Sequence, residues 1–318
     1  MTEPLDADLA MVIELLPQTD LATATPGSFR EMLLGLAAAR AATPPPEVAA
    51  VEDIAIKGVG GALPARVYRP TAQAAPTVVF FHGGGWVAGD LATHDRAARL
   101  LALETGAVVV AVDYRRPPET RFPGAFEDCL AAVRDVAARI ATFGRDARRL
   151  GVAGDSAGAN LAAAVAIACR DADFALAAQL LVYPVTDVAG LYGEARENAR
   201  FPSRTQNAEG YFLTLAMMRW FAGHYLPDAA AALDWRASPL RAKSLAGVAP
   251  AVVCTAWFDP LRDEGEAYAD ALARAGVETR RHRGAGMIHG YFGMGDASPA
   301  ARAQAARARA DFRALLGR

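Results

Sequence analysis

Hydrophobic and polar positions follow a regular order from residue 51 onward. Short runs rich in valine, isoleucine and aromatic residues recur there, and a run of this kind predicts a β-strand. The predicted strands are Val51–Ile56, Ala65–Tyr68, Thr77–Phe81, Ala107–Asp113, Leu150–Ala153, Ala178–Tyr183, Ala251–Trp257 and Val277–His282. Helical patterns lie between or after the later strands, at Asp95–Thr105, Ala125–Thr142, Ala157–Arg170, Asp263–Ala275 and Ala300–Leu316.

This order predicts an α/β fold with an eight-stranded, mostly parallel sheet flanked by helices. The first two strands are joined only by a turn that contains Gly58, Gly60 and Gly61, which favours an antiparallel hairpin. The other strands are spaced by helices, as right-handed crossover connections require. The central strands are continuously apolar, which is typical of a sheet covered on both faces.

Two segments fall outside the alternation. Residues 1–50 contain helical patterns at Ala7–Leu16 and Phe29–Ala41, and residues 186–236 contain another at Ala208–Tyr225 that is rich in methionine and aromatic side chains. Methionine and aromatic side chains at helical spacing are typical of a helix that packs in the hydrophobic core. Such a pattern also suits a lid, because lids over α/β active sites are inserted after the carboxyl ends of strands.

Composition excludes several classes of protein. The 318 residues include 33 basic and 35 acidic side chains, for a net charge of -2, so a basic nucleic-acid-binding surface is not expected. With 53% hydrophobic residues, the chain is too apolar for intrinsic disorder. No signal peptide pattern and no apolar run near the ~18 residues of a membrane span is found, which predicts a cytoplasmic enzyme.

The three cysteines, Cys129, Cys169 and Cys254, have no CxxC spacing and lie among apolar neighbours. We therefore expect them to be small buried hydrophobic residues rather than a disulfide framework or a zinc site. The sequence contains five histidines, so any chemistry that depends on histidine must use one of few residues.

The strongest chemical signal is the pentapeptide Gly154-Asp155-Ser156-Ala157-Gly158, a G-x-S-x-G motif between a predicted strand and a predicted helix. Such a motif holds a serine on a sharp turn, and its glycines let the backbone pack closely without Cβ clashes. The N-terminus of the following helix favours a developing negative charge. Ser156 is therefore the candidate nucleophile, and the alternative is a serine that only caps the helix.

A second motif, His82-Gly83-Gly84-Gly85-Trp86, directly follows the predicted strand Thr77–Phe81. Three successive glycines expose backbone N–H groups, which suits an oxyanion hole. A phosphate-binding loop is excluded, because the lysine and the helix of a P-loop are absent. We expect His82 to orient this loop by a hydrogen bond and not to titrate in catalysis.

A serine nucleophile needs a base, and the base needs an orienting carboxylate. Asp259 stands at the carboxyl end of the predicted strand Ala251–Trp257, where Pro260 stops strand pairing. Asp263 is the competing acid, but its position suits the N-cap of the next helix. Asp259 is therefore the candidate acid.

Only His282 and His289 follow these aspartates. His282 belongs to a predicted strand, whereas His289 lies beyond it in a glycine-rich loop that can bring an imidazole over Ser156. We therefore favour His289 as the base. His94 and His224 are predicted to be surface or lid residues.

At these residues the chain resembles the bacterial hormone-sensitive-lipase-like (family IV) esterases of the α/β-hydrolase superfamily. The motifs occur in family order and cover most of residues 65–295. They are HGGGW (82–86), DYR with PPE (113–119), GDSAG (154–158), YPVTD (183–187), DPLRDEG (259–265) and MIHGY (287–291). The chain departs from the family at Ala159, where GDSAGG is usual, and at Arg116, within the usual YRLAPE.

The resemblance implies an α/β-hydrolase fold with a helical cap. The catalytic core would comprise residues 51–185 and 237–318, and the cap would comprise residues 1–50 and 186–236. The implied roles are Ser156 as nucleophile, His289 as general base and then acid, Asp259 as orienting acid, and Gly83, Gly84 and Ala157 as backbone oxyanion donors.

The expected function is a serine carboxylesterase that hydrolyses short- to medium-chain acyl esters through an acyl-enzyme, without metal or cofactor. An amidase or lactonase with the same triad, or a non-catalytic ligand-binding relative, is the alternative. The expected partner is a small-molecule ester, with no nucleic acid and no membrane, and the family resemblance allows a homodimer. The predicted pocket residues, for each of which core packing is the alternative, are Trp86, Tyr211, Phe212, Met217 and Ile288.

Overall fold

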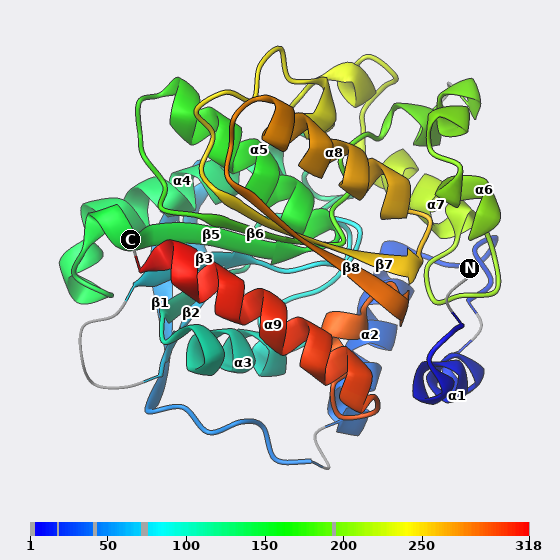
Figure 1. The fold of residues 1–318 in the computed structure, drawn as a ribbon, viewed down its shortest axis with the longest axis horizontal. Helices are drawn as coiled ribbons and strands as arrows, with labels where there is room; N and C mark the ends of the chain where they lie inside the picture. The colour runs from blue at the N-terminus through cyan, green and yellow to red at the C-terminus, as the bar shows by residue number, and fades with distance from the viewer. Residues whose placement is uncertain (1–3, 18, 41–42, 71–75, 193–194, 318) are drawn as a thin grey trace.

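The computed structural model describes residues 4–17, 19–40, 43–70, 76–192 and 195–317 (Figure 1). The strands are β1 (Ala50–Gly58), β2 (Gly61–Arg69), β3 (Thr77–Phe81), β4 (Val108–Val112), β5 (Leu150–Asp155), β6 (Gln179–Val182), β7 (Ala251–Phe258) and β8 (Thr279–Ile288). The α-helices are α1 (Ala7–Leu15), α2 (Pro26–Arg40), α3 (Asp95–Thr105), α4 (Gly124–Ala138), α5 (Ala157–Asp171), α6 (Ser203–Gln206), α7 (Leu215–Tyr225), α8 (Arg262–Arg274) and α9 (Pro299–Leu316).

All eight strands form one sheet, in the order β1-β2-β4-β3-β5-β6-β7-β8. β1 and β2 form the predicted antiparallel hairpin, β2 is antiparallel to β4, and every other neighbouring pair is parallel. The prediction of a mostly parallel eight-stranded sheet is confirmed. Because the parallel strands share a direction, the loops after β3, β5, β7 and β8 meet at one edge of the sheet.

Helices cover both faces of the sheet, with α4, α5 and α8 on one face and α3 and α9 on the other (Figure 1). The side chains of β3 show why both faces are apolar. Val79 and Phe81 pack with the α4, α5 and α8 layer, whereas Val78 and Phe80 pack with the α3 and α9 layer. All three cysteines are unpaired and buried in these layers, as predicted.

Strand β8 is longer than predicted. It continues past His282 to Ile288, so the glycines that suggested a loop lie within a strand. A Cβ on Gly284 would lie 2.6 Å from the carbonyl oxygen of Thr255 on β7, and the register between β7 and β8 shifts near this point. Glycine is needed there for close approach of two backbones at an irregular part of the sheet.

Helix α7 begins later than predicted, at Leu215 instead of Ala208. The side chain of Thr214 accepts a hydrogen bond from the backbone N–H of Met217, and this N-cap fixes the start of the helix. The rest of the segment from 186 to 236 contains short 3₁₀ turns and the single helical turn of α6. Within the part of the chain that the structure describes, no helix is long and apolar enough to cross a bilayer.

The N-terminal helices pack at the edge of the sheet where the strand ends meet (Figure 1). Leu9 of α1 is fully buried in the cluster that contains Ile288 at the end of β8. On α2, the guanidinium of Arg30 donates to the carbonyl oxygens of Val87 (2.9 Å) and Pro117 (2.8 Å). Both helices are thus attached to loops that surround the strand ends.

A buried ion pair attaches the segment from 186 to 236 to the core. Arg204 of α6 and Glu264 of α8 are both fully buried and form a salt bridge. Arg204 also donates to the side chain of Asn198 and to the carbonyl oxygen of Asp187, while Glu264 accepts from the backbone N–H of Thr186. Burial raises the pKa of Glu264, and the neighbouring Arg204 opposes that shift.

Substitution Arg204→Met should lower the free energy of unfolding by about 3–5 kcal/mol, because it leaves the Glu264 carboxylate buried without its cation. Urea denaturation measures this change. Arg148→Ala is the matched control, since Arg148 pairs with Asp146 but is 90% exposed, and it should leave the free energy of unfolding nearly unchanged. Equal losses in the two variants would contradict a structural role for the buried pair.

Candidate active site

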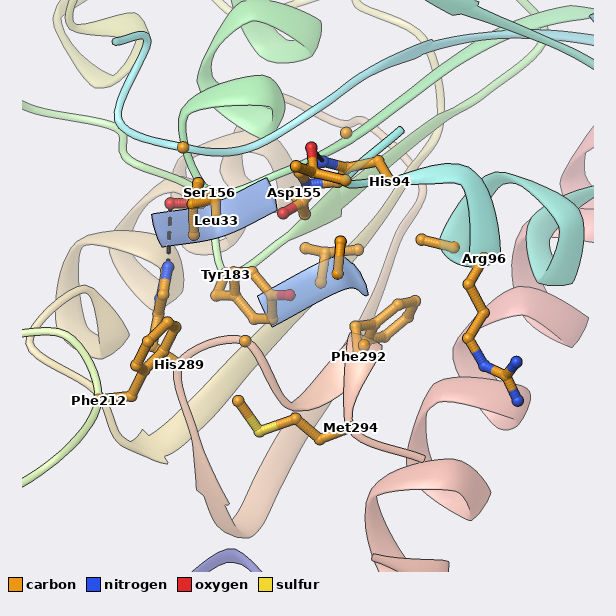
Figure 2. Close-up of a pocket in the computed structure, with 18 of the residues that line it drawn as sticks. Leu33, His94, Arg96, Asp155, Ser156, Tyr183, Phe212, His289, Phe292 and Met294 are labelled. Carbon is orange, nitrogen blue, oxygen red and sulfur yellow. Dashed lines mark hydrogen bonds and ion pairs between the residues drawn. The ribbon is translucent and has the colours of Figure 1, made fainter. Parts of the chain in front are cut away.

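Ser156 occupies a strained turn between β5 and α5. Its φ angle is 55°, in the left-handed region that residues with a Cβ rarely adopt, and its backbone N–H donates to Val182 O (2.8 Å). The side chain makes no capping bond to α5. Its Oγ lies instead 3.0 Å from Nε2 of His289 (Figure 2). The alternative in which this serine only caps the helix is therefore not supported.

The two glycines of the pentapeptide allow this turn. A Cβ on Gly154 would lie 2.3 Å from the carbonyl oxygen of Gly158, and a Cβ on Gly158 would lie 2.0 Å from the carbonyl oxygen of Phe81. Both obstacles are backbone atoms, which cannot move aside as a side chain can. The tight turn from β5 into α5 therefore requires glycine at 154, and the close approach of α5 to the end of β3 requires glycine at 158.

His289 follows β8 directly, and Asp259 follows β7. Nδ1 of His289 lies 2.7 Å from Oδ2 of Asp259, whose side chain is fully buried. The other carboxylate oxygen of Asp259 accepts from the backbone N–H of Leu261 (2.9 Å). Because a carboxylate only accepts, Nδ1 carries the proton, and Nε2 is left to accept from the hydroxyl of Ser156.

The competing histidine and aspartate lie elsewhere. His282 is on β8, where its Nε2 lies 2.9 Å from Oδ2 of Asp311 on α9. Asp263 is not the N-cap of α8, as was predicted; that position is Leu261. The prediction is wrong because the Asp263 carboxylate reaches back to the inserted segment, where Oδ2 accepts from the backbone N–H of Ser203 (2.6 Å).

The inserted segment also holds the loop that carries Asp259. The hydroxyl of Ser203 donates to Pro260 O (2.8 Å), and the amide of Asn207 donates to the carbonyl oxygens of Asp259 (3.1 Å) and Trp257 (3.2 Å). The orientation of Asp259 toward His289 therefore depends on α6 and on the residue that follows it.

The glycine loop after β3 differs from the prediction at one donor. The backbone N–H of Gly83 already donates to Oδ1 of Asp155 (3.0 Å), so the prediction that Gly83 is an oxyanion donor is wrong for this geometry. The N–H groups of Gly84, Gly85 and Ala157 have no hydrogen-bond acceptor among the described residues. Gly85, the third glycine of the motif, was not among the predicted donors, although its N–H is as free as that of Gly84 within the described residues.

His82 orients the glycine loop, as the sequence predicted. Its Nδ1 lies 2.9 Å from the carbonyl oxygen of Gly83, and its ring stacks on Tyr114 at 4.3 Å between centroids. The hydroxyl of Tyr114 in turn donates to the carbonyl oxygen of His82 (2.7 Å). Complete burial holds the pKa of His82 well below its ordinary value, so this imidazole stays neutral.

His94 lies in the wall of the site, not on the surface or in a lid as predicted (Figure 2). The prediction is wrong because the loop from Trp86 to His94 turns back beneath the glycine motif. Nε2 of His94 lies 3.3 Å from the Gly83 nitrogen and 3.5 Å from Oδ1 of Asp155. Nothing in the sequence around His94 indicates this contact. The position of Asp155 directly before Ser156 does place its carboxylate near the site, and this signal could have been used.

A cavity of about 630 Å³ opens at Ser156 and His289. Its apolar lining comes from α2, from the inserted segment and from the turn after β8. These side chains include Phe29, Leu33, Leu36, Phe212, Leu213, Met217, Met218, Phe221, Phe292 and Met294. Polar and charged residues also line the cavity, among them Asp95, Arg96, Glu104, Asp296, Arg302 and Arg309. The apolar side chains suit the largely apolar part of a small molecule.

Three of the five predicted pocket residues, Trp86, Phe212 and Met217, line this cavity. Tyr211 and Ile288 do not. The ring of Tyr211 packs against Phe258 at 4.9 Å between centroids, and Ile288 is fully buried in the core beneath the site. For these two residues, core packing was the correct alternative.

Comparison with known proteins supports one family. A family model described as alpha/beta hydrolase fold matches residues 78–293. Esterase LipI of Mycobacterium tuberculosis is 41% identical over 263 residues, which cover 79% of this chain and 78% of that protein. Ethyl acetate hydrolase of Pseudomonas putida is 38% identical over 242 residues, 74% of this chain and 73% of that protein. A solved structure of the Pyrobaculum calidifontis esterase superposes with a TM-score of 0.90 at 37% identity, over 98% of this chain and 99% of that chain.

Substitution Gly158→Ala should prevent formation of the Ser156 turn, because the new Cβ meets the Phe81 carbonyl oxygen at 2.0 Å. Labelling of Ser156 by a fluorophosphonate probe should be lost, and thermal unfolding should shift to lower temperature. The control is Gly223→Ala in α7, where a Cβ meets nothing within 4 Å. This substitution should stabilise the helix by about 0.5–1 kcal/mol, because alanine has the higher helix propensity. Labelling of the Gly158→Ala variant at the parental rate would contradict the close-packing argument.

Proposed function

Since this chain belongs to the hormone-sensitive-lipase-like (family IV) carboxylesterases of the α/β-hydrolase superfamily, we propose that it hydrolyses esters through Ser156, His289 and Asp259. Its reaction class is carboxylic ester hydrolysis. The observation that carries the proposed roles is the continuous chain of hydrogen bonds from Asp259 through His289 to Ser156. Such a chain activates a serine hydroxyl that is otherwise a weak nucleophile.

In the acylation step, Oγ of Ser156 attacks the carbonyl carbon of the ester while Nε2 of His289 takes the hydroxyl proton. The buried carboxylate of Asp259 stabilises the imidazolium that forms, because it accepts the proton on Nδ1 in a hydrogen bond. His289 then gives its proton to the departing alcohol, and the acyl group remains on Ser156. Water repeats the same sequence and releases the acid.

We assign the developing oxyanion to the N–H groups of Gly84, Gly85 and Ala157. The support is that these three donors are unoccupied within the described residues, whereas the Gly83 donor is occupied. Fixed donors aimed at the developing charge stabilise the transition state without reorganisation, and each is worth roughly 3–4 kcal/mol. Ala157 also begins α5, so the helix dipole adds to the same effect.

The N-terminal helices and the inserted segment act as a cap over this site. Residues of both line the cavity: Phe29 and Leu33 on one side, Phe212 and Met217 on the other. Phe29 also contacts Phe221 of α7, with 4.9 Å between ring centroids, so the two parts of the cap are joined directly. An apolar cover excludes water from the reacting ester and strengthens the electrostatic interactions beneath it.

The preferred substrates are short- to medium-chain acyl esters. The support is a cavity of about 630 Å³ that is enclosed by bulky side chains, with Trp86 fixed beside the glycine loop by stacking on Tyr225. One relative is named for ethyl acetate, an ester with a two-carbon acyl group. A cavity of this size suits a small ester better than a triglyceride with long chains.

Substitution Ser156→Ala should lower kcat for p-nitrophenyl butyrate by about 10⁴–10⁶, because it removes the nucleophile and leaves the rest of the site intact. Steady-state release of p-nitrophenol measures the change, and circular dichroism checks that the variant folds. Turnover of a folded Ser156→Ala variant at the parental rate would disprove the assigned nucleophile.

An acyl-chain series should give its highest kcat/KM below about twelve carbons, because bulky apolar side chains limit the length of acyl chain that the cavity beside Ser156 can hold. Leu33→Trp should lower the rate on an octanoyl ester by about tenfold relative to an acetyl ester, since Leu33 lines the cavity. The control is Leu34→Trp, because Leu34 is the next residue of α2 and is 41% exposed. A maximum at longer chains, or equal effects of the two tryptophans, would contradict this size limit.

A further inference from the structure

Among the polar residues of the cavity wall that belong neither to the triad nor to the oxyanion donors, His94 lies against the glycine loop. His94 lines the cavity, and its side chain is 17% exposed. Its Nε2 is within reach of two groups that belong to the catalytic loops: the backbone nitrogen of Gly83 (3.3 Å) and Oδ1 of Asp155 (3.5 Å). Gly83 directly precedes the donor Gly84, and Asp155 directly precedes Ser156.

The tautomer of neutral His94 follows from the contacts of its two ring nitrogens. Nδ1 lies 3.0 Å from the hydroxyl of Thr93, and that hydroxyl donates its own proton to Asp90 O (2.9 Å). The contact with Gly83 has its backbone N–H as donor, so Nε2 is the acceptor and carries no proton, and the Thr93 hydroxyl has a lone pair that can accept from Nδ1–H. A bare Nε2 accepts from the N–H of Gly83, which is then shared between His94 and Asp155.

The glycine loop has two kinds of anchor. At its outer end, Gly84 O accepts from the N–H groups of Val87 (3.1 Å) and Ala88 (2.9 Å), so the backbone itself closes the turn. At its inner end, the N–H of Gly83 is held by side chains, and those side chains are Asp155 and His94. The direction of the next N–H group, that of Gly84, depends on how firmly the inner end is held.

We propose that His94 is a positioning residue for the oxyanion hole: its neutral Nε2 shares the Gly83 N–H with Asp155 and thereby fixes the orientation of the Gly84 and Gly85 donors. His94 does not touch the reacting ester in this role and transfers no proton. The inference rests on the proposed function, since it assigns to His94 an effect on those donors.

This role predicts a particular kinetic result. A donor that is misaligned stabilises the transition state less but binds the ground-state ester almost as well. Removal of the His94 nitrogens should therefore lower kcat for p-nitrophenyl butyrate by about 10- to 100-fold, less than the 10²–10³ expected for a lost donor, and should leave KM nearly unchanged.

The experiment compares His94→Phe, His94→Gln and His94→Asn with the parent. Phenylalanine keeps the ring but has no nitrogen, the glutamine amide reaches the position of Nε2, and the shorter asparagine amide does not. We expect kcat in the order parent, Gln, then Asn and Phe. A trifluoromethyl ketone, which forms an anionic hemiketal on the serine, should lose affinity by the factor by which kcat/KM falls.

The control is His282→Phe. His282 has a similar side-chain exposure of 18% and an acidic partner, Asp311, but lies on β8 away from the glycine loop. It should keep the parental kcat and ketone affinity. If kcat falls as much in His282→Phe as in His94→Phe, the fall follows from the loss of any half-buried imidazole, and the proposal fails.

Three further outcomes would overturn the proposal: a parental kcat in His94→Phe, a rise in KM alone, or equal losses in the glutamine and asparagine variants. Thermal melts identify any variant that does not fold, and the glutamine–asparagine pair tests the proposal even if the phenylalanine variant is unstable. Formation of the hemiketal by the parent tests the proposed nucleophile separately. Failure of His94 as a positioning residue is thus distinguishable from failure of the triad.

Discussion

The contact between the start of α5 and the end of β3 is the constraint on which the site depends. Gly158 lies against the Phe81 carbonyl oxygen so closely that no Cβ fits between them. Ser156 and Ala157 stand at one side of this contact, and the glycine loop begins at the other. The nucleophile and both sources of oxyanion donors therefore have their relative positions set by backbone packing, which changes little during a reaction.

The acid of the triad is positioned in a different way, by the segment that also covers the cavity. Ser203 and Asn207 hold the loop that contains Asp259, and the buried pair of Arg204 and Glu264 fixes the same segment to the core. The cover and the acid are thus parts of one structural unit. A change in the cover that alters substrate size can therefore also alter the hydrogen bond to His289.

Most of the fold, and the meeting of Ser156, His289 and Asp259, could be predicted from the sequence, because motifs with strong backbone requirements follow strand ends in a fixed order. Residues that depend on tertiary contacts could not. Glycine serves a loop and a tight strand pair equally well, so the extension of β8 through Gly284 was missed. The environment of His94 and its contact with the Gly83 N–H depend on how the loop from Trp86 to His94 turns back toward the glycine motif. Tyr211 belonged to the helical pattern predicted for Ala208–Tyr225, but α7 begins only at Leu215, so helical periodicity could not give the direction of its side chain.

The attachment of α1 to β8 has a consequence for the order in which the protein assembles. The backbone N–H of Asp6 donates to Gly286 O, and Leu9 packs in the cluster with Met287. These contacts join two segments that are far apart in the sequence. Leu16, which directly follows α1, lines the cavity, so this part of the wall can form only after β8 has joined the sheet. Such contacts of high sequence separation form late in folding, so the folding chain carries an open site with exposed apolar side chains until β8 has paired with β7.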